Sequence, residues 1–209
     1  MGRTIPGSLP LWLIRMKLNM RKAGSPSLLT LLLLLVTAAP GLAADYRGYA
    51  MALVKNPPQG VALRPDLEAY LDRLADAYRK GKDRGGLLAD DLMRIAARAQ
   101  ALDMMLAGRS GHVSRTGVSF DSRFGAFVEN IDLFPARGEN AASDRSRKQA
   151  DEVKARHLFE LWLQSSEHRR NLAKRDYAFV STGVVQRGSE LWAVQIFWAR
   201  PIPPNPLIQ

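Results

Sequence analysis

The segment "ELWAVQIFWA" (190–199) decides the fold. In an extended chain it places Trp192, Val194, Ile196 and Trp198 on one face and Leu191, Ala193 and Phe197 on the other. Because both faces are apolar, this strand is predicted to be central in its sheet and covered on both sides. The β-branched run "FVSTGVV" (179–185) predicts a second strand, and "QRGSE" (186–190) joins the two as a hairpin.

Helical periodicity precedes these strands. The spacing of apolar residues predicts a helix over 66–80 and a second helix with the buried stripe Leu88, Leu92, Ile95, Ala96, Ala99, Leu102 and Leu106. Asp90 and Asp91 are expected in the first turn of the second helix, where the helix dipole favours anions. That helix should end near Gly108 and Gly111.

A third helix is expected over about 150–164, with Val153, Leu158, Leu161 and Trp162 facing inward. Residues 108–152 are rich in glycine, serine and charge, which predicts a long loop region that is functional or mobile. Residues 45–65 read as an irregular lead-in, and the proline-rich segment 201–209 as an extended tail. With helices first and strands last, the predicted fold class is α+β, with helices packed over a small antiparallel sheet.

The first 44 residues have the pattern of a secretory signal. They contain Arg3, Arg15, Lys17, Arg21 and Lys22 but no acidic residue, then the apolar run 28–39 and the small residues of "PGLAAD". The apolar run is shorter than the ~20 residues that a membrane-spanning helix needs. We expect cleavage after Ala43 or Ala44, and a start at Met20 would give a more typical signal. An uncleaved membrane anchor is the alternative.

Composition limits the class of partner. Without the five basic residues of the leader, the formal charge of +10 falls to about +5, which is compatible with anionic envelope surfaces but too small for a nucleic-acid-binding surface. The chain has no cysteine, so disulfides and a lipid-modified cysteine are both excluded. We therefore expect an exported monomer, periplasmic or extracellular, with no stable membrane span after cleavage.

The candidate functional residues are histidines and one glutamate. His157 falls inside the third predicted helix and is expected to be exposed. His112 ("RSGHVS") and His168 ("SSEHRRN") follow predicted helix ends, where an imidazole can face a cleft, although each alone could equally be a solvated surface residue. Glu139 lies in "RGENAAS", where glycine permits close approach or an unusual backbone angle. Taken alone, Gly-Glu-Asn reads as a turn.

The order of these segments is more informative than any one of them. A helix followed by Gly-His precedes Gly-Glu-Asn, then a helix that ends in Trp-x-x-Ser, then His-Arg-x-Asn-Leu and the Trp-rich terminal strand. Over residues 66–200 this order resembles the CAP superfamily, the cysteine-rich secretory, antigen 5 and pathogenesis-related 1 proteins, and in particular its compact bacterial secreted, SCP-like branch. The resemblance implies a three-layer α-β-α sandwich with an open cleft.

In that family two histidines and acidic residues converge in the cleft, and in several members the histidines hold a divalent metal, often zinc. Carried over, the metal ligands would be His112 and His168, with Glu139 as a further candidate. Neutral imidazole binds zinc, and a carboxylate can ligate the metal or orient the imidazole. The second glutamate of the eukaryotic members is replaced by Ser165, and Glu167 adjoins His168, so we expect weak binding.

Three functions remain open. The favoured one is a secreted binding module that holds a metal, a lipid or a cell-envelope ligand without turnover. Its basic residues Arg145, Arg147, Lys148, Arg169 and Arg170 either contact anionic polymers or form a solvated face. The second is a hydrolase in which His112, His168 and Glu139 are the candidate catalytic residues and activate water. The third is an exported scaffold whose cleft residues only stabilise loops.

A convincing nucleophile would favour the hydrolase, and the sequence offers none. Ser114, Ser165 and Ser166 adjoin a histidine only in sequence, and the metalloprotease spacing H-E-x-x-H does not occur. An enzymatic function is therefore less expected than binding.

Overall fold

The central element of the structure is a five-stranded sheet in the order β1-β4-β5-β3, with β2 beside β4. The computed structural model describes residues 41–202. Its strands are β1 (Val61–Leu63), β2 (Leu88–Ala89), β3 (Arg137–Asp144), β4 (Phe179–Arg187) and β5 (Glu190–Trp198). The predicted hairpin and its central strand are confirmed, because β5 lies between β4 and β3 and is antiparallel to both.

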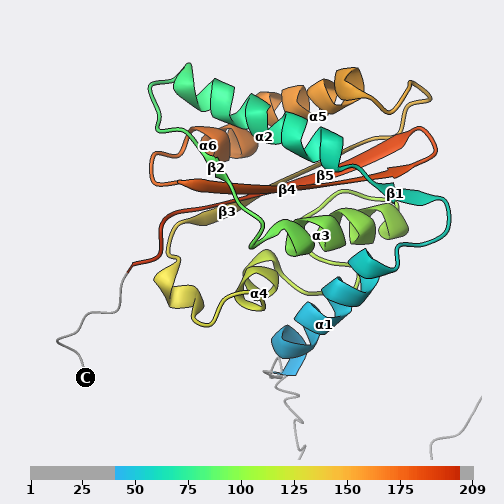
Figure 1. The fold of residues 1–209 in the computed structure, drawn as a ribbon, viewed down its shortest axis with the longest axis horizontal. Helices are drawn as coiled ribbons and strands as arrows, with labels where there is room; N and C mark the ends of the chain where they lie inside the picture. The colour runs from blue at the N-terminus through green and yellow to red at the C-terminus, as the bar shows by residue number, and fades with distance from the viewer. Residues whose placement is uncertain (1–40, 203–209) are drawn as a thin grey trace, which may run out of the picture. The chain divides into compact units, whose positions relative to one another are not determined.

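Helices cover both faces of this sheet (Figure 1). On one face lie α2 (Pro65–Lys80), α5 (Glu152–Gln164) and α6 (Ser166–Ala173), and on the other α1 (Gly41–Lys55), α3 (Arg94–Ala107) and α4 (Phe120–Gly125). The alternation predicted for β5 separates the two cores: Trp192, Val194, Ile196 and Trp198 pack with α3, and Leu191, Ala193 and Phe197 pack with α2 and α5. The chain is therefore an α-β-α sandwich.

The first and third predicted helices occur as α2 and α5. The Asp151 carboxylate accepts hydrogen bonds from the backbone N–H groups of Val153 and Lys154, so the cap begins α5 at Glu152. Leu158 and Trp162 are fully buried, as predicted. The inward placement of Val153 was wrong: its exposed fraction is 75%, because it lies in the first turn away from the buried stripe.

The second predicted helix begins later than expected. Leu88 and Ala89 form β2, which pairs in parallel with β4, and α3 starts only at Arg94. Asp90 interrupts the helix, because its carboxylate accepts the backbone N–H of Leu92 in a turn. Consequently Asp90 and Asp91 precede the helix, and Leu88 and Leu92 are exposed instead of buried. Leu106, in the last turn of α3, is also exposed. Ala96, Ala99 and Leu102 are buried as predicted, and Ile95 is partly buried. Gly108 ends the helix at φ 67°.

Two regions contain more regular structure than the sequence suggested. The lead-in includes α1 and β1, and residues 108–152 include α4, the 3-10 turn η1 (Ile131–Leu133) and β3. Gly-Glu-Asn is part of β3 and not a turn, since β3 pairs with β5 along its whole length.

The predicted leader and tail fall almost entirely outside the described residues, apart from 41–44 and 201–202. Within residues 41–202, no helix combines the length and hydrophobicity that a bilayer span requires.

Candidate functional site

His112, Glu139 and His168 lie together beside β3. The ring centroids of His112 and His168 are 5.8 Å apart, with the rings inclined at 64°. His112 Nδ1 lies 2.9 Å from Glu139 Oε1. The three residues come from the loop after α3, from β3 and from α6. Folding thus joins residues that are 27 and 29 positions apart along the chain.

The position of β3 at an edge of the sheet explains this convergence. Side chains alternate along a strand, so Glu139 faces the layer of α3 and α4 while Asn140 faces α6. At the edge no further strand separates the two helical layers. His112 approaches from one layer and His168 from the other.

Glu139 is held by a buried arginine that the sequence analysis did not identify. The exposed fractions of the Arg123 and Glu139 side chains are 0% and 1%. Arg123 Nη1 lies 2.9 Å from Oε2 of Glu139, and Nη2 donates to Oε1 at 2.9 Å and to the carbonyl oxygen of His112 at 3.1 Å. Burial would raise the pKa of Glu139, but Arg123 and His112 outweigh it and lower the pKa below its ordinary value. Glu139 is therefore a carboxylate.

The two imidazoles differ electrostatically. The hydrogen bond to Glu139 raises the pKa of His112 above its ordinary value. Because the carboxylate can only accept, Nδ1 of His112 is the donor, and in the neutral ring Nε2 carries the lone pair that a ligand can use. Burial, reinforced by the charge of His112, lowers the pKa of His168. His168 is therefore neutral at neutral pH, the state in which imidazole ligates metals.

Local structure in α6 fixes the second imidazole. His168 lies in the first turn of α6 and not beyond a helix end, because the hydroxyl of Ser165 caps the helix and accepts the backbone N–H of His168. The Asn140 side chain donates to the carbonyl oxygen of His168 at 3.2 Å. Ser165, at the position of the second family glutamate, thus has a structural role.

Gly138 allows α6 to approach β3. Asn171 Nδ2 donates to the carbonyl oxygen of Glu139 at 3.1 Å and to Asn140 Oδ1 at 3.0 Å. A Cβ atom at position 138 would lie 2.8 Å from Asn171 Oδ1 and would also collide with the Tyr177 hydroxyl. Of the two roles considered for this glycine, close approach is the one present, since its φ is not positive.

These residues surround a pocket of about 230 Å³, lined by His112, Phe120, Glu139, Glu167, His168 and Asn171. Glu167 stands at the rim: its side chain is 81% exposed and lies 3.8 Å from Arg170. Ser114 is buried and does not line this pocket; its hydroxyl contacts Thr116 and accepts the backbone N–H of Val118.

His112 and His168 are the side chains of this pocket whose ring nitrogens could hold a metal. In residues 41–202, no three His, Cys, Asp or Glu side chains form a group that could hold a metal ion. Oε1 of Glu139 bonds with His112 and Arg123, and Oε2 lies 2.9 Å from Nη1 of Arg123, so the carboxylate is placed to orient His112. Two imidazoles on one tetrahedral zinc ion have ring centroids about 5 Å apart, close to the separation of His112 and His168.

The remaining candidates lie elsewhere. His157 is exposed, as predicted, and its Nδ1 lies 2.8 Å from Asp144. Among the basic residues, Arg145 pairs with Glu190 at 3.3 Å and Arg169 donates to the carbonyl oxygen of Leu163. These contacts are typical of a solvated, internally paired face.

Comparisons with known proteins agree with this architecture. The model of the family described as CAP, Cysteine-rich secretory protein family, matches residues 73–197. No curated protein matches the chain significantly. Among solved structures, an outer surface protein from Borrelia burgdorferi is 17% identical with a TM-score of 0.57, over 67% of this chain and 97% of that one. An extracellular SCP-domain protein from Bacillus anthracis is 23% identical with a TM-score of 0.54, over 65% of this chain but only 41% of that one. At these identities the likeness shows the fold alone.

Proposed function

Because the chain belongs to the CAP, or cysteine-rich secretory protein, family, we propose that it is an exported binding protein whose His112–His168 pocket holds a divalent metal or a small ligand without turnover. The observation that carries this proposal is the pair of imidazoles 5.8 Å apart, one of them oriented by a buried carboxylate. The leader pattern supports export, as does likeness to an outer surface protein and an extracellular protein.

In this proposal His112 Nε2 and His168 hold the metal, and Glu139 keeps the imidazole of His112 in the correct tautomer. A bound zinc ion would supply a positive charge to which an anionic or carbonyl group of a ligand can coordinate. With two protein ligands and a His112 side chain that is 50% exposed, a metal here would also need water as ligand, and its binding would be weak.

Zinc binding tests the proposal directly. Equimolar zinc should raise the melting temperature of the wild type, and calorimetry should give one site per chain. His112→Ala/His168→Ala should show neither effect. His157→Ala is the matched control, because it removes a histidine outside the pocket and should keep the zinc response. An equal zinc response in the wild type and the double variant would contradict the proposal.

One observation favours a second candidate, hydrolysis. His112 and Glu139 form a hydrogen-bonded imidazole–carboxylate pair, which can act as a general base on water. In that case Glu139→Gln should abolish turnover while the melting curve still shows a cooperative transition. Peptides, esters and peptidoglycan fragments are the substrates to screen. If the wild type turns over none of them, hydrolysis is rejected and binding is the function that stands.

Export is tested separately. Amino-terminal sequencing of the protein recovered from the periplasm or the medium should begin at Ala44 or Asp45, which corresponds to cleavage after Ala43 or Ala44. Recovery of the uncleaved chain with the membrane fraction would support the anchor alternative.

A further inference from the structure

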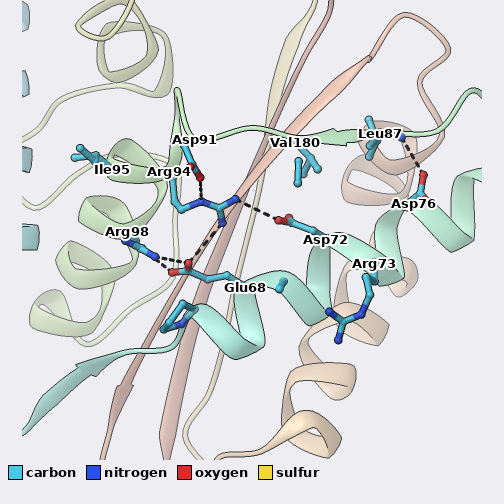
Figure 2. A pocket seen from close by; sticks show the side chains of 13 residues that line it. Glu68, Asp72, Arg73, Asp76, Leu87, Asp91, Arg94, Ile95, Arg98 and Val180 are labelled. Atoms are coloured by element: carbon cyan, nitrogen blue, oxygen red, sulfur yellow. Dashed lines mark hydrogen bonds and ion pairs between the residues drawn. The ribbon is translucent and has the colours of Figure 1, made fainter.

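A second and larger pocket lies at the opposite edge of the sheet. It has a volume of about 690 Å³ and is bounded by α2, β2, α3 and Val180 of β4 (Figure 2). Both β1 and β2 pair with the outer edge of β4, at Val185–Arg187 and at Phe179–Val180. Between them, residues 181–184 have no partner strand on this edge, and the pocket opens there.

Charged side chains complete this edge in place of a strand. Arg94 Nη1 donates to the carbonyl oxygen of Thr182 at 3.1 Å, and Glu68 Oε1 accepts the backbone N–H of Val184 at 3.1 Å. Arg98 forms a bidentate pair with Glu68 at 2.8 and 2.6 Å. The burial of Glu68 thus has a structural cause, because an unpaired backbone group at a buried edge is costly.

Asp72 is the one carboxylate of the pocket without its own cation. Three others have a close basic partner: Glu68–Arg98 at 2.6 Å, Asp91–Arg94 at 2.5 Å and Asp76–Lys80 at 2.7 Å. The nearest cation to Asp72 is the shared Arg94, whose Nη2 lies 3.6 Å from Oδ2. Arg73 does not compensate, because it is 66% exposed and lies toward Glu152 of α5.

The burial of Asp72 makes this imbalance significant. Its exposed fraction is 7%, and Oδ1 accepts the hydroxyl hydrogen of Thr182. Oδ2 lies 3.6 Å from Nη2 of Arg94, which is longer than a hydrogen bond, and the Asp72 side chain lines the pocket (Figure 2). Burial raises the pKa of Asp72 to about 6, even with Arg94 nearby. A buried carboxylate in this state gains from a further donor.

We propose that this pocket is a second ligand site, which binds small organic cations through Asp72. A primary ammonium group would donate to Oδ2 of Asp72 and supply the missing positive charge. The attached chain would lie on the apolar part of the lining, which consists of Pro65, Ala69, Leu87, Ala89, Ile95 and Val180. The site is independent of the histidine pocket, since the two lie at opposite edges of the sheet.

Three probes of equal chain length test the site: n-hexylammonium, n-hexanol and hexanoate, each titrated into the 15N-labelled full chain at pH 7.5. Hexylammonium should shift the backbone resonances of Ala89, Ile95 and Val180, with a dissociation constant about tenfold below that of hexanol, and hexanoate should bind least. Equal affinities for the three probes, or shifts confined to other residues, would overturn the proposal.

Asp72→Asn should reduce the affinity for hexylammonium to that for hexanol. The amide oxygen can still accept from Thr182, and the unfolding transition reports whether the fold survives. Ala69→Phe is a second test that leaves the charges intact, because this exposed α2 residue lines the pocket and a larger side chain fills it. Asp132→Asn, an exposed charge in η1, should bind as the wild type does. Undiminished binding by both Asp72→Asn and Ala69→Phe would refute the site.

Discussion

Arg123 and Glu139 form an ion pair from which solvent is almost fully excluded, with exposed fractions of 0% and 1% and two N–O distances of 2.9 Å. The pair joins α4 to β3 and, through the carbonyl oxygen of His112, to the loop after α3. The guanidinium group of Arg123 therefore holds together α4, β3 and the loop after α3, which form or border the histidine pocket.

Replacing only Arg123 should destabilise the fold more than replacing both Arg123 and Glu139. Arg123→Met leaves the buried Glu139 carboxylate with the half-exposed His112 as its one basic partner among the described residues, so the free energy of unfolding should fall by about 3–5 kcal/mol. Arg123→Met/Glu139→Gln should recover much of that loss, because no buried charge remains. Urea denaturation measures both values. If the double variant is as unstable as the single one, uncompensated charge is not the cause of the loss.

The pocket histidines should titrate on opposite sides of the ordinary value of 6.5. The Glu139 hydrogen bond raises the pKa of His112, so the stability it contributes is present below pH 6.5 and is lost as the pH rises through its folded pKa. Burial lowers the pKa of His168, so its protonation destabilises the fold as the pH falls below 6.5. NMR titration of the ring protons assigns both, and Glu139→Gln should lower the pKa of His112.

Three glycines should respond differently to alanine. Gly183→Ala should be the most destabilising, because its Cβ would collide with backbone atoms of α3 at Ala97 and Arg98. At Gly138 the colliding atoms belong to side chains, so alanine should cost about 1–3 kcal/mol and weaken zinc binding by displacing Asn171. The control is Gly48 in α1, where nothing lies within 4 Å and alanine should stabilise the helix by about 0.5–1 kcal/mol. Thermal melts give the order, and equal effects at the three positions would contradict it.

Asp72 should make stability depend on pH in the direction opposite to an ordinary paired carboxylate. Its pKa is raised from 3.8 to about 6, by burial and by Glu68 against the opposing effects of Thr182 and Arg94. Between these values the native state binds more protons than the unfolded state, so the free energy of unfolding falls as the pH rises. Relative to the wild type, Asp72→Asn should gain about 2 kcal/mol between pH 4 and pH 7. Parallel pH profiles would contradict the assignment.

The hairpin and the main helices could be predicted from the sequence because their apolar periodicity is strong. β5 has seven apolar positions on two faces, and each face enters its own core. β3 could not be predicted in this way: "RGENAASD" has no β-branched residue, and pairing with β5 makes it a strand. Leu88 is apolar but exposed, because two residues of backbone pairing with β4 outweigh helical periodicity there.

The candidate site likewise contains residues that the sequence predicts and residues that only the folded structure reveals. The order of the motifs indicated His112, Glu139 and His168, but nothing local marked Arg123, whose partner is 16 positions away. A signal was available for α6, since Ser165 caps it three residues before His168. Glu68, Asp72 and Asp76 also recur at intervals of four along α2. That spacing places them on one face but does not reveal which of them lacks a cation.

The side chains around both pockets also close the two outer edges of the sheet: Arg94 and Glu68 satisfy backbone groups of β4, and Asn171 satisfies one of β3. Substitution at these positions frees main-chain donors and acceptors that another copy could pair with, the usual start of edge-to-edge aggregation. Precipitation of such variants would therefore reflect an uncovered strand, and it should be measured by light scattering before any loss of affinity is attributed to the ligand contacts.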